Sequence, residues 1–238
     1  MLVNTKAIVL TSLKFGESDL IVKCYTEVGV KTYMLKRIFK SKSNKINIAY
    51  FQPLTQLNIT ANHNTKGNLN SIREVRLSHV YQSIPSDIYK QAISLFLAET
   101  LSYALQEEEK NENLFQFLET ALIWFDNHEK TANFHLLFLL NLTKYLGFYP
   151  EMKNMVAPYF NLSEGYFSMN KPFTEFVFGE KLILFKSLIG INFDAIESLQ
   201  LNSKNRTMVL EILLHYYELH LAGFKKPKSF TILKEVFQ

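Results

Sequence analysis

The 238-residue sequence has a single cysteine, Cys24, and eight glycines that are never closer than 11 positions apart. One thiol excludes an intramolecular disulfide and any zinc or iron–sulfur site built from several thiolates. Phosphate-binding loops and dinucleotide fingerprints need clustered glycines, because there the backbone must approach an anion closely. We therefore expect no cofactor and no ATP- or NAD-dependent chemistry by these common routes.

Long apolar runs are missing as well. The longest uninterrupted apolar stretches are five residues, at 121–125 and 136–140, whereas a bilayer-spanning helix needs roughly 18 or more. The opening Met-Leu-Val-Asn-Thr-Lys lacks the apolar core and cleavage site of a signal peptide. These absences predict a cytoplasmic protein without a membrane partner.

Acidic residues are absent from one long segment near the N-terminus. Residues 1–80 hold 12 Lys and Arg against 4 Asp and Glu, while residues 81–238 hold 14 against 18. No acidic residue lies between Glu27 and Glu74, and that gap contains eight basic residues: Lys31, Lys36, Arg37, Lys40, Lys42, Lys45, Lys66 and Arg73. Such asymmetry predicts that the N-terminal half binds a polyanion.

The hydrophobic period changes near residue 80, which predicts two domains, at 1–82 and 83–238. Before the change, apolar residues alternate with polar ones, as in Leu57, Ile59 and Ala61. We predict five strands, three of them at 5–13, 20–26 and 30–36, closed into a small barrel whose basic loop over 36–45 joins the third and fourth strands.

Beyond Pro85 the pattern is helical, so the predicted fold class is α+β. Helices are expected over about 87–106, 114–127, 131–146, 174–188 and 204–221. The runs 136–140 and 210–217 are apolar on nearly every face, which predicts that these two helices are buried. Residues 150–172 have no helical period and predict an irregular insert.

Several short motifs stand near the two ends of the sequence. They are Thr5-Lys6-Ala7-Ile8-Val9-Leu10, the turn Phe15-Gly16-Glu17-Ser18-Asp19, the Thr26…Gly29 connection and Gln52-Pro53-Leu54. Near the C-terminus, Arg206 is followed by His220-Leu221-Ala222-Gly223 and Lys228-Ser229. In their order and spacing these motifs resemble the RecO family. The resemblance covers the whole chain and implies an N-terminal OB-fold followed by a helical body.

Many RecO proteins carry a four-cysteine zinc module in the helical body, and here the chain departs from the family. Tyr159-Phe160-Asn161-Leu162 and Gly165 are similar to the framework of that module, but every cysteine is missing. No Cys or His lies between His135 and His215. Because zinc needs such ligands in a fixed geometry, we predict that this protein binds no metal.

The basic gap is the candidate nucleic-acid site. Lys and Arg that neutralise phosphates release counterions, and aromatic rings on OB-type sheets stack on bases. Tyr33 and Phe39 interleave with the basic residues, so the candidate site comprises Lys31, Tyr33, Lys36, Arg37, Phe39, Lys40, Lys42, Lys45, Lys66 and Arg73. The alternative is that the lysines form a solvated surface and the rings fill the barrel.

The family resemblance also implies partners. These are RecR, RecA and the C-terminal tail of the single-stranded-DNA-binding protein SSB, an acidic tail that ends in an aromatic residue. A receptor for this tail needs an apolar pocket beside a cation, and the candidates are Lys186, Lys204 and Arg206. The sequence does not choose among them.

The sequence therefore predicts a non-enzymatic DNA repair and recombination mediator. It would bind single-stranded DNA, with double-stranded DNA as a second candidate ligand. It would promote annealing and load RecA with RecR on SSB-coated DNA at the nucleoid. An alternative is an RNA-binding OB-fold protein that acts on ribosomal or transfer RNA. No nucleophile, base and oxyanion donor can be assembled, because Cys24 lies in an apolar segment and the histidines lack ligand spacing.

Overall fold

The computed structural model describes residues 1–40, 46–64, 69–105 and 110–237. Contacts divide the chain into two compact units. The first comprises Met1–Asn127 with Pro227–Ser229, and the second comprises His128–Lys226 with Phe230–Gln238. The first unit therefore contains the N-terminal strands together with two helices, and each unit is described separately below.

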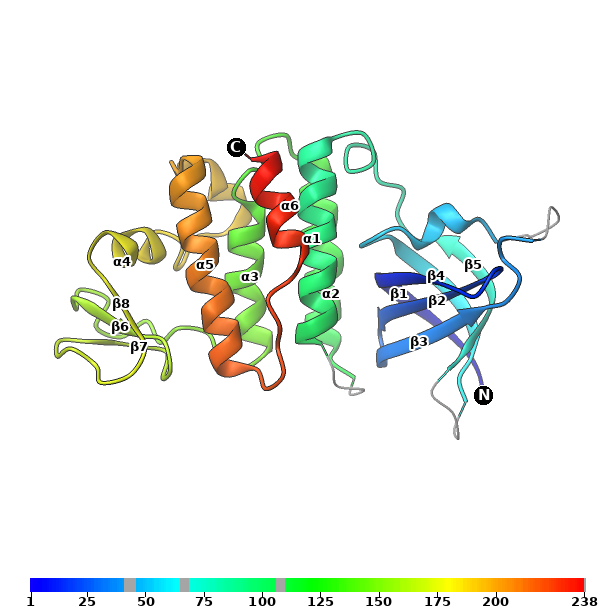
Figure 1. The fold of residues 1–238 in the computed structure, drawn as a ribbon, viewed down its shortest axis with the longest axis horizontal. Coiled ribbons are helices and arrows are strands. Elements are labelled where there is room, and N and C mark those ends of the chain that lie inside the picture. The colour runs from blue at the N-terminus through cyan, green and yellow to red at the C-terminus, as the bar shows by residue number, and fades with distance from the viewer. Residues whose placement is uncertain (41–45, 65–68, 106–109, 238) are drawn as a thin grey trace. The chain divides into compact units, whose positions relative to one another are not determined.

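The first unit is built on a five-stranded antiparallel sheet in the order β3-β2-β1-β4-β5. In Figure 1 its strands run from dark blue to cyan. The strands are β1 (Leu2–Phe15), β2 (Asp19–Thr26), β3 (Gly29–Leu35), β4 (Gln56–Asn62) and β5 (Ser71–Leu77), with a short 3-10 helix at Ile48–Phe51 before β4. The predicted α+β class is confirmed.

The sheet does not close into the predicted barrel. Its edge strands β3 and β5 approach each other at one parallel bridge, Tyr33 with Asn70. There Asn70 N–H donates to the carbonyl of Thr32, and Met34 N–H donates to that of Asn70. In the described residues no ladder extends from this bridge, so the sheet is a partly open form of the five-stranded OB architecture.

A β-bulge in β1 changes which side chains face the core. Ala7 and Val9 lie in the core cluster, but the register with β2 shifts between Val9 and Thr11. Beyond the shift, Ser12 pairs with buried Val22, so the next odd-numbered residues point away from the core. Leu13 and Phe15 are consequently 65% and 51% exposed. Burying such side chains would stabilise a fold by about 1.5–3 kcal/mol each.

Two helices complete the first unit, α1 (Ile88–Ala104) and α2 (Glu112–Asn127). Asp87 caps α1, because its side chain accepts hydrogen bonds from the N–H groups of Tyr89 and Lys90. Part of the outward sheet face packs on these helices: the Tyr25 ring stacks on that of Phe115 at 6.0 Å. Lys23 Nζ also donates to the carbonyl of Ser102.

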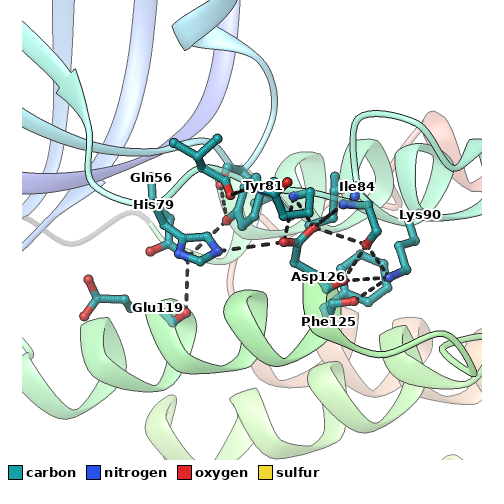
Figure 2. Close-up of polar contacts among 12 residues, drawn as sticks. Gln56, His79, Tyr81, Ile84, Lys90, Glu119, Phe125 and Asp126 are labelled. Atoms are coloured by element: carbon teal, nitrogen blue, oxygen red, sulfur yellow. Dashed lines mark hydrogen bonds and ion pairs between the residues drawn. The ribbon is translucent and has the colours of Figure 1, made fainter.

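A buried polar network fixes the segment that leads from β5 into α1 (Figure 2). The Asp126 carboxylate accepts hydrogen bonds from the N–H groups of Gln82, Ser83 and Ile84. Lys90, which is 2% exposed, donates to the carbonyls of Phe125 and Asp126. Burial by itself would raise the pKa of Asp126, but the hydrogen bonds outweigh it and hold this pKa below its usual value.

The described residues of the second unit form four α-helices, of which α6 has its first residue in the first unit, and a small sheet. The helices are α3 (Phe134–Tyr145), α4 (Gly179–Lys186) and α5 (Ser203–His220), with a 3-10 helix at Phe193–Ser198, and α6 (Ser229–Val236) follows. Leu136 to Leu140 are all at most 1% exposed, which confirms that α3 is buried. In α5, Leu210, Leu213 and Tyr217 are buried while Glu211 is exposed, so only part of that run is enclosed.

The predicted irregular insert is an ordered three-stranded sheet in the order β7-β6-β8. Its strands are β6 (Tyr159–Asn161), β7 (Tyr166–Ser168) and β8 (Phe176–Phe178). The helix predicted over 174–188 is therefore wrong at its start. Phe176 and Val177 pair with β6, and helix α4 begins only at Gly179, whose φ of +61° separates it from the strand.

Candidate nucleic-acid interface

The segment after β3 lies against the β1–β2 turn. The N–H of Arg37 donates to the Asp19 carboxylate at 2.7 Å, and the N–H of Phe39 donates to the carbonyl of Ser18 at 3.1 Å. Lys40 Nζ lies 2.8 Å from a Glu17 carboxylate oxygen. These contacts place the first half of the predicted basic loop at one end of the sheet.

Arg37 has an unusual backbone conformation. Its φ of +58° is left-handed, a region that non-glycine residues enter at a cost of about 1 kcal/mol or more. The bond from its N–H lowers the pKa of Asp19 most strongly, followed by the Ser18 hydroxyl, and the nearby charge of Lys36 adds to this. A carboxylate that stays ionised therefore holds a strained arginine at the surface.

Lys14 joins this group, although the sequence analysis did not select it. Its Nζ lies 5.4 Å from the centroid of the Phe39 ring, a cation–π contact. Phe39 is 43% exposed, and Lys36, Arg37 and Lys40 are exposed. We call Lys14, Lys36, Arg37 and Lys40 the basic corner. Lys14 was missed because it lies outside the acid-free segment. In addition, the bulge that turns its side chain toward Phe39 cannot be recognised from the spacing of residues in the sequence.

Two other predicted basic residues lie on the edge strands. Lys31 is half-buried near the start of β3, about 16 Å from Lys36 along an extended chain. Arg73 is exposed at a register shift in β5, three residues beyond the bridge at Asn70. Tyr33 is the partner of Asn70 in this bridge, and Lys36 lies three residues beyond Tyr33. Because the strands run parallel there, Arg73 lies toward the end that carries the basic corner, whereas Lys31 lies toward the other end.

The structure corrects the assignment of Tyr33 as a base-stacking residue. Tyr33 is 0% exposed and lies in the core of the sheet. Its hydroxyl is hydrogen-bonded to His63 Nε2 at 2.9 Å, and burial raises its pKa well above the usual value. Residue 33 faces the core because it pairs with Val22, so of the two predicted stacking rings only Phe39 is exposed. The predicted residues Lys42, Lys45 and Lys66 lie outside the described residues.

The one cysteine is a core residue, as predicted. Cys24 is 0% exposed, and burial raises the pKa of its thiol to about 12. A neutral, enclosed thiol is a poor nucleophile at physiological pH. The side chain therefore packs the sheet and offers no reactive group.

The three candidate partner-binding cations have different surroundings. Lys186 donates to the carbonyl of Ala157 at 2.7 Å, and Arg206 donates to Asn133 and to the carbonyl of Leu201. These two side chains therefore hold loops of the second unit in place. Lys204 lines a cavity of about 520 Å³ between α4, α5 and α6, together with Lys181, Lys234, Ser203, Thr207, Met208 and Glu211.

The fold and the basic corner define a class of protein: an α+β chain with a partly open OB-type sheet, a cationic surface on that sheet and a helical second part. Two family models match it, one described as the N-terminal part of recombination protein O over residues 1–81, the other as its C-terminal part over residues 85–229. The chain belongs to the RecO family of DNA repair and recombination proteins. The resemblance noted in the sequence is thus confirmed.

Named relatives match along their full length. A protein named DNA repair protein RecO from Flavobacterium psychrophilum is 48% identical over 238 residues, which is all of both chains. Proteins of the same name from Christiangramia forsetii and Bacteroides fragilis are 47% and 34% identical, again over the whole of both chains. Among the described residues, every helix is too short or too polar to span a lipid bilayer.

The insert does not fit the zinc module that the family resemblance implies. Its centre is aromatic: the Phe160 ring lies 4.8 Å from Phe167, 5.0 Å from Phe185 and 5.8 Å from Tyr216, measured between centroids. In the described residues no three His, Cys, Asp or Glu side chains gather as metal ligands. Apolar packing occupies the place where metal ligation would organise this sheet.

Proposed function

We propose that the protein is a non-enzymatic recombination mediator that binds single-stranded DNA at the basic corner. The observation that carries this proposal is the gathering of Lys14, Lys36, Arg37 and Lys40 around a turn with two carboxylates. Asp19 is already engaged by the N–H of Arg37. Cations held at such a surface neutralise phosphates and release condensed counterions, which gives affinity without sequence preference.

Annealing of complementary strands follows from the same surface. A cationic surface screens the repulsion between two phosphate backbones, while an exposed ring such as Phe39 can hold a base unpaired. Together with RecR the protein would act on SSB-coated DNA at the nucleoid and help load RecA. The family's role in DNA repair supports these steps.

A salt titration tests the DNA site. If about six phosphates are neutralised, the logarithm of the binding constant for a single-stranded oligonucleotide should fall linearly with the logarithm of the salt concentration, with a slope of about −4. The variant Lys36→Glu/Arg37→Glu/Lys40→Glu should lose most of the affinity and anneal strands poorly in the presence of SSB. The control Lys153→Glu/Lys171→Glu/Lys225→Glu makes the same charge change in the second unit and should behave like the parent. Affinity that is flat with salt, or a triple variant that anneals normally, contradicts the proposal.

Competition separates DNA from RNA as the ligand. A DNA oligonucleotide should displace bound DNA at least as well as an RNA of the same sequence. If the RNA is the stronger competitor by an order of magnitude, the site belongs to an RNA-binding protein instead.

The SSB tail would bind at the cavity that Lys204 lines. Three lysines, Lys181, Lys204 and Lys234, surround it, and Met208 supplies an apolar surface. This combination suits an acidic peptide that ends in an aromatic residue. Lys204→Glu should weaken binding of a labelled tail peptide, measured by anisotropy, while Lys153→Glu should leave it unchanged; equal affinities would remove this assignment.

A further inference from the structure

Beyond the bulge in β1, the outward face of the sheet carries a row of apolar side chains on three strands. Leu13 pairs with Ile21, and Ile21 pairs with Met34, so the three side chains lie side by side on one face. Phe15 follows Leu13 on the same face of β1. We call Leu13, Phe15, Ile21 and Met34 the apolar row.

The apolar row is exposed because of the bulge. Without the register shift after Val9, residues 13 and 15 would continue the core-facing series that begins with Ala7 and Val9. Instead Phe15 is 51% exposed at the end of β1. Bulges of this kind re-aim side chains and are common beside functional sites. The exposure of Phe15 therefore results from the bulged register of β1 and not from fraying at the end of the strand.

The surroundings of the apolar row are cationic. Lys36 and Arg37 follow Met34 where β3 ends, whereas Lys14 pairs with the core residue Leu20 and therefore points to the opposite face of the sheet. Of the two carboxylates at this end, Asp19 accepts from Arg37 N–H and Ser18, and Glu17 pairs with Lys40. An apolar and aromatic surface bordered by positive charge matches a ligand with planar apolar faces and a phosphate backbone.

We propose that the apolar row is the platform for unpaired bases of a single strand, with Phe15 stacking on one base while the basic corner holds the adjacent phosphates. This proposal rests on the proposed function. It identifies the apolar row as the part of the DNA-binding surface that distinguishes single strands from duplexes. In a duplex the base faces are stacked on each other and cannot reach Phe15, whereas the phosphates remain accessible to the basic corner. Phe15 therefore contributes affinity for single strands only.

The test uses the full-length chain and an oligonucleotide that carries 2-aminopurine, whose fluorescence reports stacking. Phe15→Ala should weaken single-strand binding roughly tenfold, within the range of one lost aromatic stack. It should leave the salt slope and the affinity for duplex DNA unchanged, and it should reduce the change in 2-aminopurine fluorescence on binding. Phe15→Trp should restore affinity.

Leu2→Ala is the matched control, because Leu2 is 53% exposed on the same strand at its opposite end. This variant should bind like the parent, and thermal unfolding should show that both alanine variants are folded. If Phe15→Ala binds single strands as the parent does and the salt slope is unchanged, the apolar row is not a base-stacking platform, but the proposed function still stands. If the parent shows no salt-dependent binding at all, the proposed function itself fails.

Two further outcomes would reassign the apolar row. A parent that sediments as a dimer, which Phe15→Ala converts to a monomer without a change in DNA affinity, would show that a second copy covers it. Equal losses of single-strand and duplex affinity in Phe15→Ala would show that the ring supports the basic corner and does not stack on a base.

Discussion

The N–H of Arg37 lies 2.7 Å from the carboxylate of Asp19, and this bond joins the β1–β2 turn to the first residues after β3. Arg37 adopts a left-handed conformation there. The backbone conformation of Arg37 in the basic corner therefore depends on Asp19, one of the two carboxylates at this surface. At residue 37, backbone stability therefore favours glycine, whereas DNA binding favours the positive charge of arginine.

The first prediction concerns Arg37→Gly. Glycine adopts a φ of +58° without strain, so the variant should be as stable as the parent or more stable by up to about 1 kcal/mol. DNA affinity should nevertheless fall, and the salt slope should become less steep by about 0.7, because one phosphate contact is lost. Denaturant melts and salt titrations measure the two effects separately.

Asn154→Gly is the control for Arg37→Gly, because Asn154 also has a positive φ, of 56°, but lies in the second unit. Its DNA affinity should equal that of the parent. A decrease as large as that of Arg37→Gly would mean that backbone relaxation and not charge governs binding.

The second prediction concerns the pH dependence of stability through Asp126. Its pKa is lower in the folded protein than the usual 3.8. The ionised carboxylate therefore contributes its full stability above the unfolded-state pKa, and this contribution is lost as the pH falls through the lowered folded-state pKa. Asp126→Ala leaves the N–H groups of Gln82, Ser83 and Ile84, the last of them buried, without their acceptor and should cost about 3 kcal/mol at neutral pH.

Unfolding measured from neutral pH down to about pH 2 checks this reasoning about Asp126. The gap in stability between the parent and Asp126→Ala should narrow at the acid end of the series. A constant gap would mean that the loss comes from packing and not from the carboxylate.

The third prediction concerns two glycines that share a left-handed backbone. Gly165 and Gly147 have φ values of +75° and +84°, but a Cβ at Gly165 would lie 2.6 Å from the Tyr216 hydroxyl, whereas nothing lies within 4 Å at Gly147. That hydroxyl donates to the carbonyl of Phe148 and has little freedom to move. Gly165→Ala should therefore lower stability by roughly 1–3 kcal/mol more than Gly147→Ala does, as thermal unfolding would measure. Equal losses would show that Tyr216 moves aside.

Much of the fold could be predicted from the sequence, because periodicity reports burial. The alternation at Leu57, Ile59 and Ala61 indicated β4, and the continuous apolar run in α3 indicated a buried helix. The small sheet of the insert escaped prediction, because strands of three residues are too short to show a period. Their formation depends on the aromatic cluster around Phe160, which joins residues far apart in the chain.

The candidate site was predicted less completely, since charge counts identify a segment but not a surface. The acid-free segment includes Lys36, Arg37 and Lys40, which the structure shows to be exposed, and their role in binding stays a prediction. The composition of this segment does not show that Tyr33 is buried. The face of the sheet on which Tyr33 lies depends on the register of β3 with β2. Phe15 was missed for the related reason that one bulged residue inverts the two faces of a strand.

The last prediction separates two lysines that the sequence placed in one group. Lys36 is exposed in the basic corner. Lys31 is half-buried near the opposite end of β3, where burial and then the charge of Lys31 itself lower the pKa of His63. At about 16 Å the two charges are separated by more than a Debye length at physiological ionic strength, so they act independently on exposed phosphates. Lys36→Gln should weaken single-strand binding several-fold and reduce the salt slope by about 0.7, whereas Lys31→Gln should leave both unchanged. If the two variants lose affinity equally, the strand must pass along the whole length of β3, and the interface is larger than the basic corner.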